Sequence, residues 1–351
     1  MALKMGIIGY GGMAGWHHKS ISEVPGVEII GAYDIRDEIK EKIVENKLIS
    51  YCGAEELCAD PKIDLVLVST PNDTHKIYSI MALRAGKHVI CEKPVTMNAA
   101  ELEEIITVSK ECGKFFTVHQ NRRWDKDYLM IKNILDTGIL NDPYMIETRV
   151  QGSRRYLHEW RGYAVNGGGM VYDWGVHLID QILCLFPEKV ISVDAHLQEI
   201  YSDEVDDNFT MTMRFKSGLS VLVNVATNCF ITQPRWHVSC KDGTVVINDW
   251  DCKGKIIKLN ENADELSWDE VIVYTAAGPT RTMAPRPKET TVDIPLPKVK
   301  AEWSDFYKNV CAVIKGTEEP FVKPEEALRT MRIIDAAFES NKTKASVNCE
   351  I

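Results

Sequence analysis

The chain has 351 residues, of which 45% are hydrophobic and 26% charged, the composition of a soluble globular protein long enough for two domains. Its formal net charge of −10 argues against nucleic acid or an anionic membrane as the main partner. No apolar run reaches the length of a transmembrane helix and no signal peptide is evident, which predicts a cytoplasmic protein. The ten cysteines lack metal-binding spacing, so no structural metal is predicted.

The first predicted elements form a strand–turn–helix unit of the kind that binds nucleotides. Residues 3–8 are an apolar strand, followed at once by the segment Gly9-Tyr10-Gly11-Gly12-Met13-Ala14. In the pattern Gly-x-Gly-x-x-Ala the first glycine permits a tight turn and the second lets the backbone approach a pyrophosphate. The small alanine lets the next helix, residues 13–24, pack on the sheet with its amino end towards the phosphates. An ordinary glycine-rich turn has the same composition, so the pattern alone is a weak signal.

The second predicted strand, residues 27–33, supports a dinucleotide site. It ends at Asp34, 25 positions after Gly9, where an acidic side chain accepts hydrogen bonds from the adenosine ribose and favours NAD. Arg36 follows two positions later and offers an alternative, because it would stack on adenine or bind the 2′-phosphate of NADP. We expect NAD rather than NADP, since the carboxylate of Asp34 would repel that phosphate.

Strands and helices alternate strictly in the first part of the chain. Further predicted strands cover residues 64–69, 87–91 and 114–118, and predicted helices cover residues 37–46, 77–85 and 99–112. This alternation predicts a doubly wound parallel sheet, so residues 1–122 are expected to form a Rossmann domain of the α/β class. Three polar clusters follow strand ends, and we expect them to line one cleft. These clusters are residues 69–75, 92–94 and 119–123.

One strand end in this domain carries a charged pair followed by proline. Residues 89–91 are predicted to be buried, and the strand stops at Glu92-Lys93-Pro94. Such a strand delivers an ammonium group to the carboxyl edge of the sheet, where ligands bind in open α/β folds. Pro94 disfavours helical geometry at Lys93 and so helps to direct its side chain. The alternative interpretation is an ordinary surface lysine.

After Arg123 the strands no longer alternate with helices. Residues 123–351 are therefore expected to form an α+β domain with a large open, mainly antiparallel sheet that binds substrate. Helices within residues 301–340 are expected to pack back on the first domain. Because an open sheet needs cover for its second face, we predict a homodimer or homotetramer formed through it. The predicted strands are residues 144–151, 190–199, 209–215, 219–226, 235–239, 244–248, 255–259 and 271–274.

A glycine-rich turn in the second half leads into a helix that carries an acid and an imidazole. Residues 167–169 are glycines, and Asp173 and His177 follow four positions apart, a spacing that places both on one helical face. A carboxylate beside an imidazole is a common way to orient a general acid or base. Two other interpretations stay open, namely structural roles for both side chains and metal ligation by the pair, for which no third ligand is evident.

The segment 154–161 combines arginine with aromatic residues. Such residues suit a sugar or polyol pocket, in which aromatic rings pack against C–H groups and guanidinium groups bind hydroxyls or carboxylates. The same composition occurs in nucleic-acid binding, but the negative net charge argues against that partner. A solvated basic loop is the structural alternative.

Together these motifs resemble those of the glucose–fructose oxidoreductase, inositol dehydrogenase and MocA-like (Gfo/Idh/MocA) family. The matching segments are residues 9–12, 69–72 with His75, 85–94, 121–123, 160–161 and 167–180. The resemblance implies an NAD(P)-dependent oxidoreductase that acts on a sugar, a cyclitol or a related polyhydroxyl compound. It also implies that Lys93 contacts the substrate hydroxyl and the nicotinamide ribose, while Asp173 and His177 complete the acid–base set. Glu92 and Asn121 would line the cofactor side.

The implied reaction is hydride transfer between nicotinamide and a secondary hydroxyl or ketone. In our hypothesis His177, held by Asp173, removes the hydroxyl proton and Lys93 stabilises the alkoxide; in part of the family the lysine itself takes the proton. A second function is that of relatives that keep their nicotinamide bound and recycle it, in sugar oxidoreduction or elimination. A third is a non-catalytic NAD(P)-binding sensor.

The site predictions can be stated residue by residue. The predicted catalytic residues are Lys93, Asp173 and His177, and no metal ligand is predicted. The predicted cofactor-binding residues are Gly9, Tyr10, Gly11, Gly12, Met13, Ala14, Asp34, Ile35, Arg36, Ser69, Thr70, Pro71, Asn72, His75, Glu92, Lys93 and Asn121. The predicted substrate-binding residues are Lys93, Arg122, Arg154, Tyr156, Trp160, Arg161, Asp173 and His177.

Overall fold

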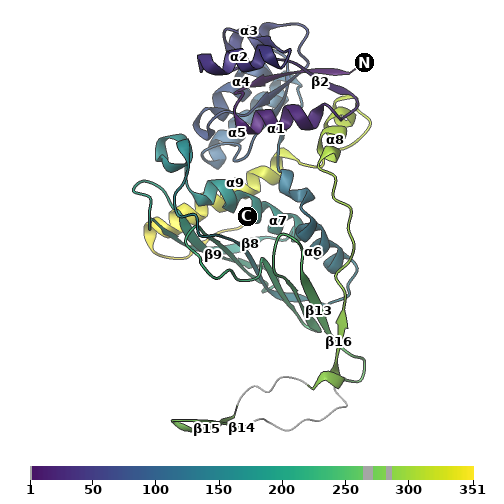
Figure 1. The fold of residues 1–351 in the computed structure, drawn as a ribbon, viewed down its shortest axis with the longest axis vertical. Coiled ribbons are helices and arrows are strands. Elements are labelled where there is room, and N and C mark those ends of the chain that lie inside the picture. The colour runs from purple at the N-terminus through teal and green to yellow at the C-terminus, as the bar shows by residue number, and fades with distance from the viewer. Residues whose placement is uncertain (1, 264–271, 282–286) are drawn as a thin grey trace.

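The computed structural model describes residues 2–263, 272–281 and 287–351, and two large sheets dominate it (Figure 1). The N-terminal sheet has six parallel strands in the order β3-β2-β1-β4-β5-β6. These strands are β1 (Leu3–Ile8), β2 (Val27–Tyr33), β3 (Ile49–Ser50), β4 (Leu65–Val68), β5 (His88–Cys91) and β6 (Phe116–Val118). The helices of this region are α1 (Gly12–Ile21), α2 (Asp37–Glu45), α3 (Ala54–Ala59), α4 (His75–Arg84) and α5 (Ala99–Cys112).

This strand order confirms the predicted doubly wound sheet. The order reverses between β1 and β4, which opens a crevice at the carboxyl ends of these two strands. All four residues of β4 are 0% exposed, as expected for a central parallel strand that is covered on both faces. Neither α3 nor β3 is recognisable in the sequence, because six and two residues are too few for a periodic pattern to show.

The second sheet has nine strands in the order β16-β13-β12-β11-β7-β10-β9-β8-β17. The predicted mainly antiparallel arrangement is confirmed, with one parallel pair between β7 and β10. The strands are β7 (Pro143–Gln151), β8 (Val190–Gln198), β9 (Asn208–Phe215), β10 (Ser220–Ala226), β11 (Trp236–Cys240), β12 (Gly243–Ile247), β13 (Gly254–Leu259), β16 (Thr291–Ile294) and β17 (Val347–Asn348).

One predicted strand of this sheet is misplaced. Residues 272–274 belong to β14 (Ile272–Thr275), which among the described residues pairs with β15 (Gly278–Arg281) in a separate two-stranded sheet. Residue 271 lies outside the described residues. The period-two pattern indicates a strand but not the partner with which it pairs. A strand of an isolated hairpin therefore has the same sequence pattern as a strand of the large sheet.

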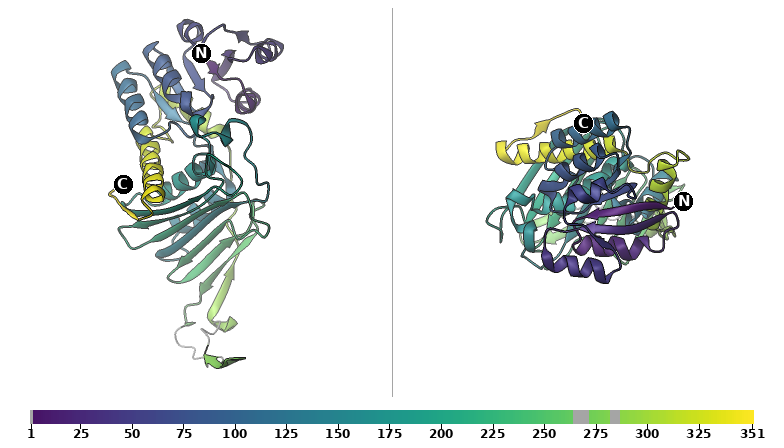
Figure 2. Two further views of the ribbon diagram at one scale, coloured as in Figure 1. Left: turned by 90° about the vertical axis from the view of Figure 1, so that its left-hand side faces the viewer. Right: turned by 90° about the horizontal axis from the view of Figure 1, so that it is seen from above.

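Three helices lie between the nine-stranded sheet and the first domain (Figures 1 and 2). They are α6 (Lys126–Asp136), α7 (Val176–Leu185) and α9 (Pro324–Thr343). The alternating pattern of β9 explains which face they cover. Phe209, Met211 and Met213 are at most 1% exposed, while Thr210 and Thr212, which point to the opposite face, are more accessible. No described helix covers the opposite face, and self-association through it stays a prediction. None of the described helices is both long and apolar enough to cross a bilayer.

The C-terminal segment returns to the first domain. Helix α8 (Ser304–Ile314) lies beside α1 (Figure 1), and the Cys311 thiol donates to the Gly26 carbonyl at 3.5 Å. Further along, the Val322 carbonyl accepts a hydrogen bond of 2.8 Å from Thr117 on β6. Helix α9 packs on α5, α7 and β8. The chain therefore crosses between its two sheets more than once, and the cleft between them has walls from both.

Candidate active site

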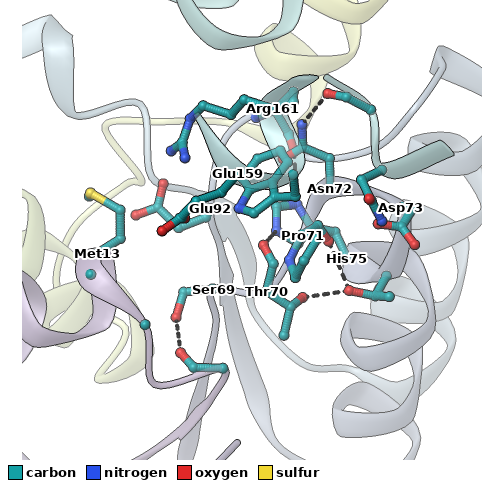
Figure 3. A pocket seen from close by; sticks show the side chains of 18 of the residues that line it. Met13, Ser69, Thr70, Pro71, Asn72, Asp73, His75, Glu92, Glu159 and Arg161 are labelled. Carbon is teal, nitrogen blue, oxygen red and sulfur yellow. Dashed lines mark hydrogen bonds between the residues drawn. The ribbon is translucent and has the colours of Figure 1, made fainter. Parts of the chain in front are cut away.

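A cleft of about 650 Å³ opens at the carboxyl ends of β1, β2, β4 and β5. The first domain lines it with the glycine turn and the segments after β2, β4 and β5, and Glu159 and Arg161 of the second domain lie above Ser69 and Thr70 in Figure 3. The predicted cofactor-binding residues in its lining are Gly9, Gly11, Gly12, Met13, Asp34, Ile35, Arg36, Ser69, Thr70, Pro71, Asn72, His75, Glu92 and Lys93. The buried Tyr10 and Ala14 and Asn121 are not part of the lining.

The glycine turn leaves open space over unpaired amide groups. Gly9 has φ +88°, and an added Cβ would lie 2.7 Å from the Ser69 carbonyl oxygen, so only glycine suits this position. An added Cβ on Gly12 would meet no atom within 4 Å, and no side chain caps the first turn of α1. Free amides at a helix start attract a phosphate group. These residues therefore fit the pyrophosphate of a dinucleotide.

Asp34 lies at the end of the cleft next to this turn and is only 4% exposed. It accepts hydrogen bonds from the Tyr10 amide at 2.8 Å and from the Arg36 Nε and Nη2 groups at 2.9 and 3.1 Å. Burial alone would raise the pKa of Asp34, but its hydrogen bonds and the charge of Arg36 hold that pKa below the usual value. The carboxylate is thus ionised and oriented before any ligand arrives.

Lys93 and Asp173 form an ion pair across the two domains. The Lys93 ammonium donates to Asp173 Oδ1 at 3.0 Å and to the Asp173 carbonyl at 2.9 Å, and the Arg161 Nε group lies 3.4 Å from the same Oδ1. Burial would raise the pKa of Asp173, but the charges of Lys93 and Arg161 outweigh it and lower that pKa. The pair therefore holds a proton donor and an ionised acceptor together at one point of the cleft.

A second pocket of about 360 Å³ adjoins this point. Arg161 and Asp173 line both the cleft and the pocket, whereas Trp160 faces the cleft only. Arg154 and Tyr156, predicted to bind substrate, line the pocket with Leu157, His158, Met170, Trp174 and a stretch of β10. A ligand in the cleft and one in the pocket would meet at the Lys93–Asp173 pair, which is the arrangement that hydride transfer between two bound molecules requires.

In our hypothesis Asp173 holds His177, whereas in the structure the Asp173 carboxylate pairs with Lys93 and Arg161. Residues 171–175 form a π-helical turn, in which bonds run from i to i+5, so residues four apart do not lie directly above one another. His177 is 3% exposed, and its Nδ1 has no hydrogen-bond partner among the described residues. Burial, followed by the charges of Lys93 and Arg122, holds the pKa of His177 well below its usual value.

Only two of the three predicted strand-end clusters line the cleft. Within the first, His75 places its ring nitrogens 2.8 and 2.9 Å from the carbonyl oxygens of Pro94 and Thr70, which ties the ends of β4 and β5 together. In the third cluster, Arg123 binds Asp180 through two hydrogen bonds of 2.7 and 2.8 Å. Arg123 therefore anchors the start of the second domain to α7.

Arg122 and Asn121 of the third cluster also lie away from both cavities. The Arg122 guanidinium packs 4.3 Å from the Trp174 ring centroid and donates to Asp125 at 3.0 Å. It thus supports Trp174, which lines the second pocket, instead of lining it directly. The Asn121 side-chain oxygen has no partner among the described residues.

The three consecutive glycines dock the second domain on the first. The Gly167 carbonyl accepts a hydrogen bond of 2.7 Å from Asn72, drawn in Figure 3. An added Cβ on Gly168 would lie 2.2 Å from the Arg161 carbonyl oxygen, and one on Gly169, at φ +102°, would lie 2.3 Å from Asp206 Oδ1. Each glycine is therefore required by a close approach, and together they place Arg161 in the cleft.

A buried histidine–carboxylate group was not recognised in the sequence. His17, Glu92 and His119 bring their polar atoms within 4.8 Å of one another, the spacing of a three-ligand metal group within the described part of the chain. This cluster is not visible in the sequence because His17 lies 75 positions before Glu92, and spacing rules for metal ligands detect only local pairs.

Comparisons with known proteins agree with this architecture. A family profile described as "Oxidoreductase family, NAD-binding Rossmann fold" matches residues 3–120, and a second, described as "GFO/IDH/MocA C-terminal domain", matches residues 128–246. A scyllo-inositol 2-dehydrogenase (NADP(+)) of Bacillus subtilis is 29% identical, with 99% of this chain and 96% of the relative covered. A myo-inositol 2-dehydrogenase of Thermotoga maritima is 28% identical, with 63% and 68% covered. The crystal structure of an NAD-binding protein from Listeria innocua is 40% identical, with a TM-score of 0.94 and 99% of both chains covered.

Proposed function

The chain belongs to the Gfo/Idh/MocA family of NAD-binding oxidoreductases, and on that premise we propose that it transfers a hydride between a nicotinamide cofactor and a secondary hydroxyl or ketone of a sugar, inositol or related polyol. The observation that carries the proposal is the Lys93–Asp173 ion pair at the junction of the cleft and the second pocket. The relatives named as inositol dehydrogenases support the substrate class.

The residues that would hold the cofactor follow from the cleft. The turn at Gly9–Gly12 and the start of α1 suit the pyrophosphate, and Asp34 with Arg36 suits the adenosine ribose. The opposite end, at Glu92 and Lys93, then takes the nicotinamide half. The bound cofactor supplies the hydride chemistry, and the protein supplies position and charge.

We propose the same catalytic residues as before, Lys93, Asp173 and His177. Their contacts change the role that each is assigned. Lys93 hydrogen-bonds the reacting oxygen. As an ammonium it donates a proton to the ketone oxygen during reduction, and as the neutral amine it takes the hydroxyl proton during oxidation. Lys93 has this role because it lines the cleft, whereas His177 lines neither cavity. Asp173 holds that ammonium in place. The buried His177, whose pKa burial lowers, would join this set only by turning its unpartnered Nδ1 into the cavity when a substrate binds.

Replacing Arg36 by alanine is expected to weaken binding of NADP about tenfold more than binding of NAD. The Arg36 side chain is 49% exposed and lines the cleft while it donates to Asp34. A 2′-phosphate bound there would gain a contact between charged groups worth about 1.5–3 kcal/mol. The measurement is the Kd for each cofactor, with Lys40→Ala as the control, because Lys40 is a nearby cation paired with Asp37. Equal losses for both cofactors would show that Arg36 does not distinguish them.

The function is tested by following the near-ultraviolet absorbance of reduced nicotinamide. Purified protein is given NAD or NADP together with a panel of inositols, aldoses, uronic acids and glycosides. Growth of absorbance with one class of polyol supports a freely exchanging dehydrogenase and names its substrate. A flat trace over the whole panel, with cofactor that resists dialysis, would replace the proposal with chemistry on a permanently bound cofactor.

A further inference from the structure

Four buried side chains from four separate segments form one hydrogen-bonded network, with His17 on α1, Glu92 directly after β5, His119 directly after β6 and Tyr307 on α8. The His17 Nε2 and His119 Nδ1 atoms lie 2.6 and 2.8 Å from the same oxygen, Oε1 of Glu92. The Tyr307 hydroxyl of α8 contacts the other ring nitrogen of His17. None of the four residues is more than 5% exposed. The proposed chemistry uses none of the three outer members, so the network needs a separate explanation.

Hydrogen-bond chemistry determines where the protons of this network lie. The Tyr307 hydroxyl donates to His17 Nδ1, so the neutral ring of His17 carries its proton on Nε2 and donates it to Glu92. His119 donates to the same oxygen through Nδ1–H. Burial lowers the pKa of His17 and raises that of Tyr307, which agrees with this assignment. The neutral ring of His17 thus donates to Glu92 without neutralising its negative charge.

The contact distances favour hydrogen bonds over a bound metal ion. Nitrogen and oxygen ligands of zinc lie about 2.0–2.2 Å from the metal, which separates tetrahedral ligands by about 3.3 Å from one another. The two distances at Glu92 Oε1 are 2.6 and 2.8 Å, within the range of charge-assisted hydrogen bonds. The network is therefore a means of holding the carboxylate.

The carboxylate that the network holds faces the cleft. Glu92 lines it beside Lys93. It follows β5, which lies three strands from β2 in the sheet, and β2 is followed by Asp34, so Glu92 belongs to the half of the cleft assigned to nicotinamide. The other carboxylate oxygen, Oε2, accepts a hydrogen bond of 3.1 Å from the Lys93 amide, so both oxygens are fixed in orientation. Burial would raise the pKa of Glu92, but His119 and His17 hold that pKa well below its usual value.

We propose that the Tyr307–His17–Glu92–His119 network holds an ionised carboxylate at the nicotinamide end of the cleft and thereby favours the oxidised, cationic cofactor over the reduced one. The inference rests on the proposed function. The oxidised ring carries a positive charge that the reduced ring lacks, so a fixed negative charge nearby stabilises one form selectively. The charges of Lys93, Arg161 and Asp173 also face this region. They are the same in the wild-type protein and in the variants proposed below, so they do not affect the comparison. Glu92 is the member whose charge can be removed alone.

Glu92→Gln is expected to lower the ratio of the Kd for reduced cofactor to the Kd for oxidised cofactor about tenfold. The variant would thus bind the reduced form more favourably, relative to the oxidised form, than the wild-type protein does. Both constants are measured by quenching of tryptophan fluorescence, without turnover. Tenfold in this ratio corresponds to about 30 mV in the midpoint potential of the bound couple. Tyr307→Phe keeps the ring packing and removes only the hydroxyl, and we expect it to shift the ratio in the same direction by about threefold, since the buried His17 Nδ1 then loses its donor.

The control variant is His88→Gln. His88 is a half-buried histidine at the opposite end of β5 that accepts a hydrogen bond of 3.0 Å from the Phe115 amide, and it should leave the ratio unchanged. Ratios within a factor of two of wild type in both Glu92→Gln and Tyr307→Phe would overturn the inference and leave the proposed function intact. One equivalent of tightly held zinc that is lost with His17→Gln would overturn it as well. Failure of the wild-type protein to bind either cofactor would defeat the proposed function and the inference together.

Discussion

Lys93→Ala is expected to lower kcat about 1,000-fold while leaving the protein folded and able to bind its cofactor. The variant removes the amino group that lies 3.0 Å from Asp173. In the proposed mechanism this group protonates the ketone oxygen as an ammonium during reduction and accepts the hydroxyl proton as a neutral amine during oxidation. Positioned proton transfer contributes about 100- to 10,000-fold to rate, and electrostatic stabilisation of a developing charge adds to it. Steady-state kinetics with the best substrate of the panel measure the effect.

Two further variants separate the roles of this lysine. Lys93→Arg keeps a cation beside Asp173 but does not release a proton near neutral pH, so a loss similar to that in Lys93→Ala would identify proton transfer as the main contribution. Lys110→Ala is the control, since Lys110 is 70% exposed and paired with Glu325 on the surface. If Lys93→Ala retained at least a tenth of wild-type kcat and His177→Ala were inactive, proton transfer would be assigned to His177 and not to Lys93.

Properties that depend on neighbouring residues were predictable from the sequence. The tight turn at Gly9, the buried strand before Glu92 and the alternation in β9 are local patterns, and each produces the predicted element. The cleft followed from topology, because parallel strands share a carboxyl edge and the polar residues after β4 and β5 therefore had to meet. Fourteen of the cofactor-binding predictions line the cleft for that reason.

Pairings between distant side chains were not predictable from the sequence alone. Lys93 and Asp173 are 80 positions apart, and Tyr307 and His17 are 290 apart, so no spacing rule connects them. The expected partner of Asp173 was His177 because four positions make one face of an α-helix. The π-helical turn that removes this relation depends on how the surrounding residues pack, and no local pattern announces it.

Gly168→Ala is expected to reduce kcat/KM about 100-fold and to lower the free energy of unfolding by about 1–3 kcal/mol. The added Cβ would lie 2.2 Å from the Arg161 carbonyl oxygen and 2.9 Å from that of Tyr163, so this segment must move away. The Gly169 amide, which donates to the Arg161 carbonyl at 3.0 Å, would lose its partner. Arg161 then withdraws from Asp173, and a displacement of about 1 Å at a catalytic group is enough for such a loss.

Gly162→Ala is the matched control, because Gly162 directly follows Arg161 and an added Cβ there meets no atom within 4 Å. If it keeps wild-type kcat/KM while Gly168→Ala does not, the loss comes from the contact with the Arg161 carbonyl and not from reduced flexibility of the segment. Equal activity of the two variants would mean that the segment yields without disturbing Asp173. Arg161 would then be a wall of the cleft and not a part of the charge arrangement that holds Lys93 and Asp173 together.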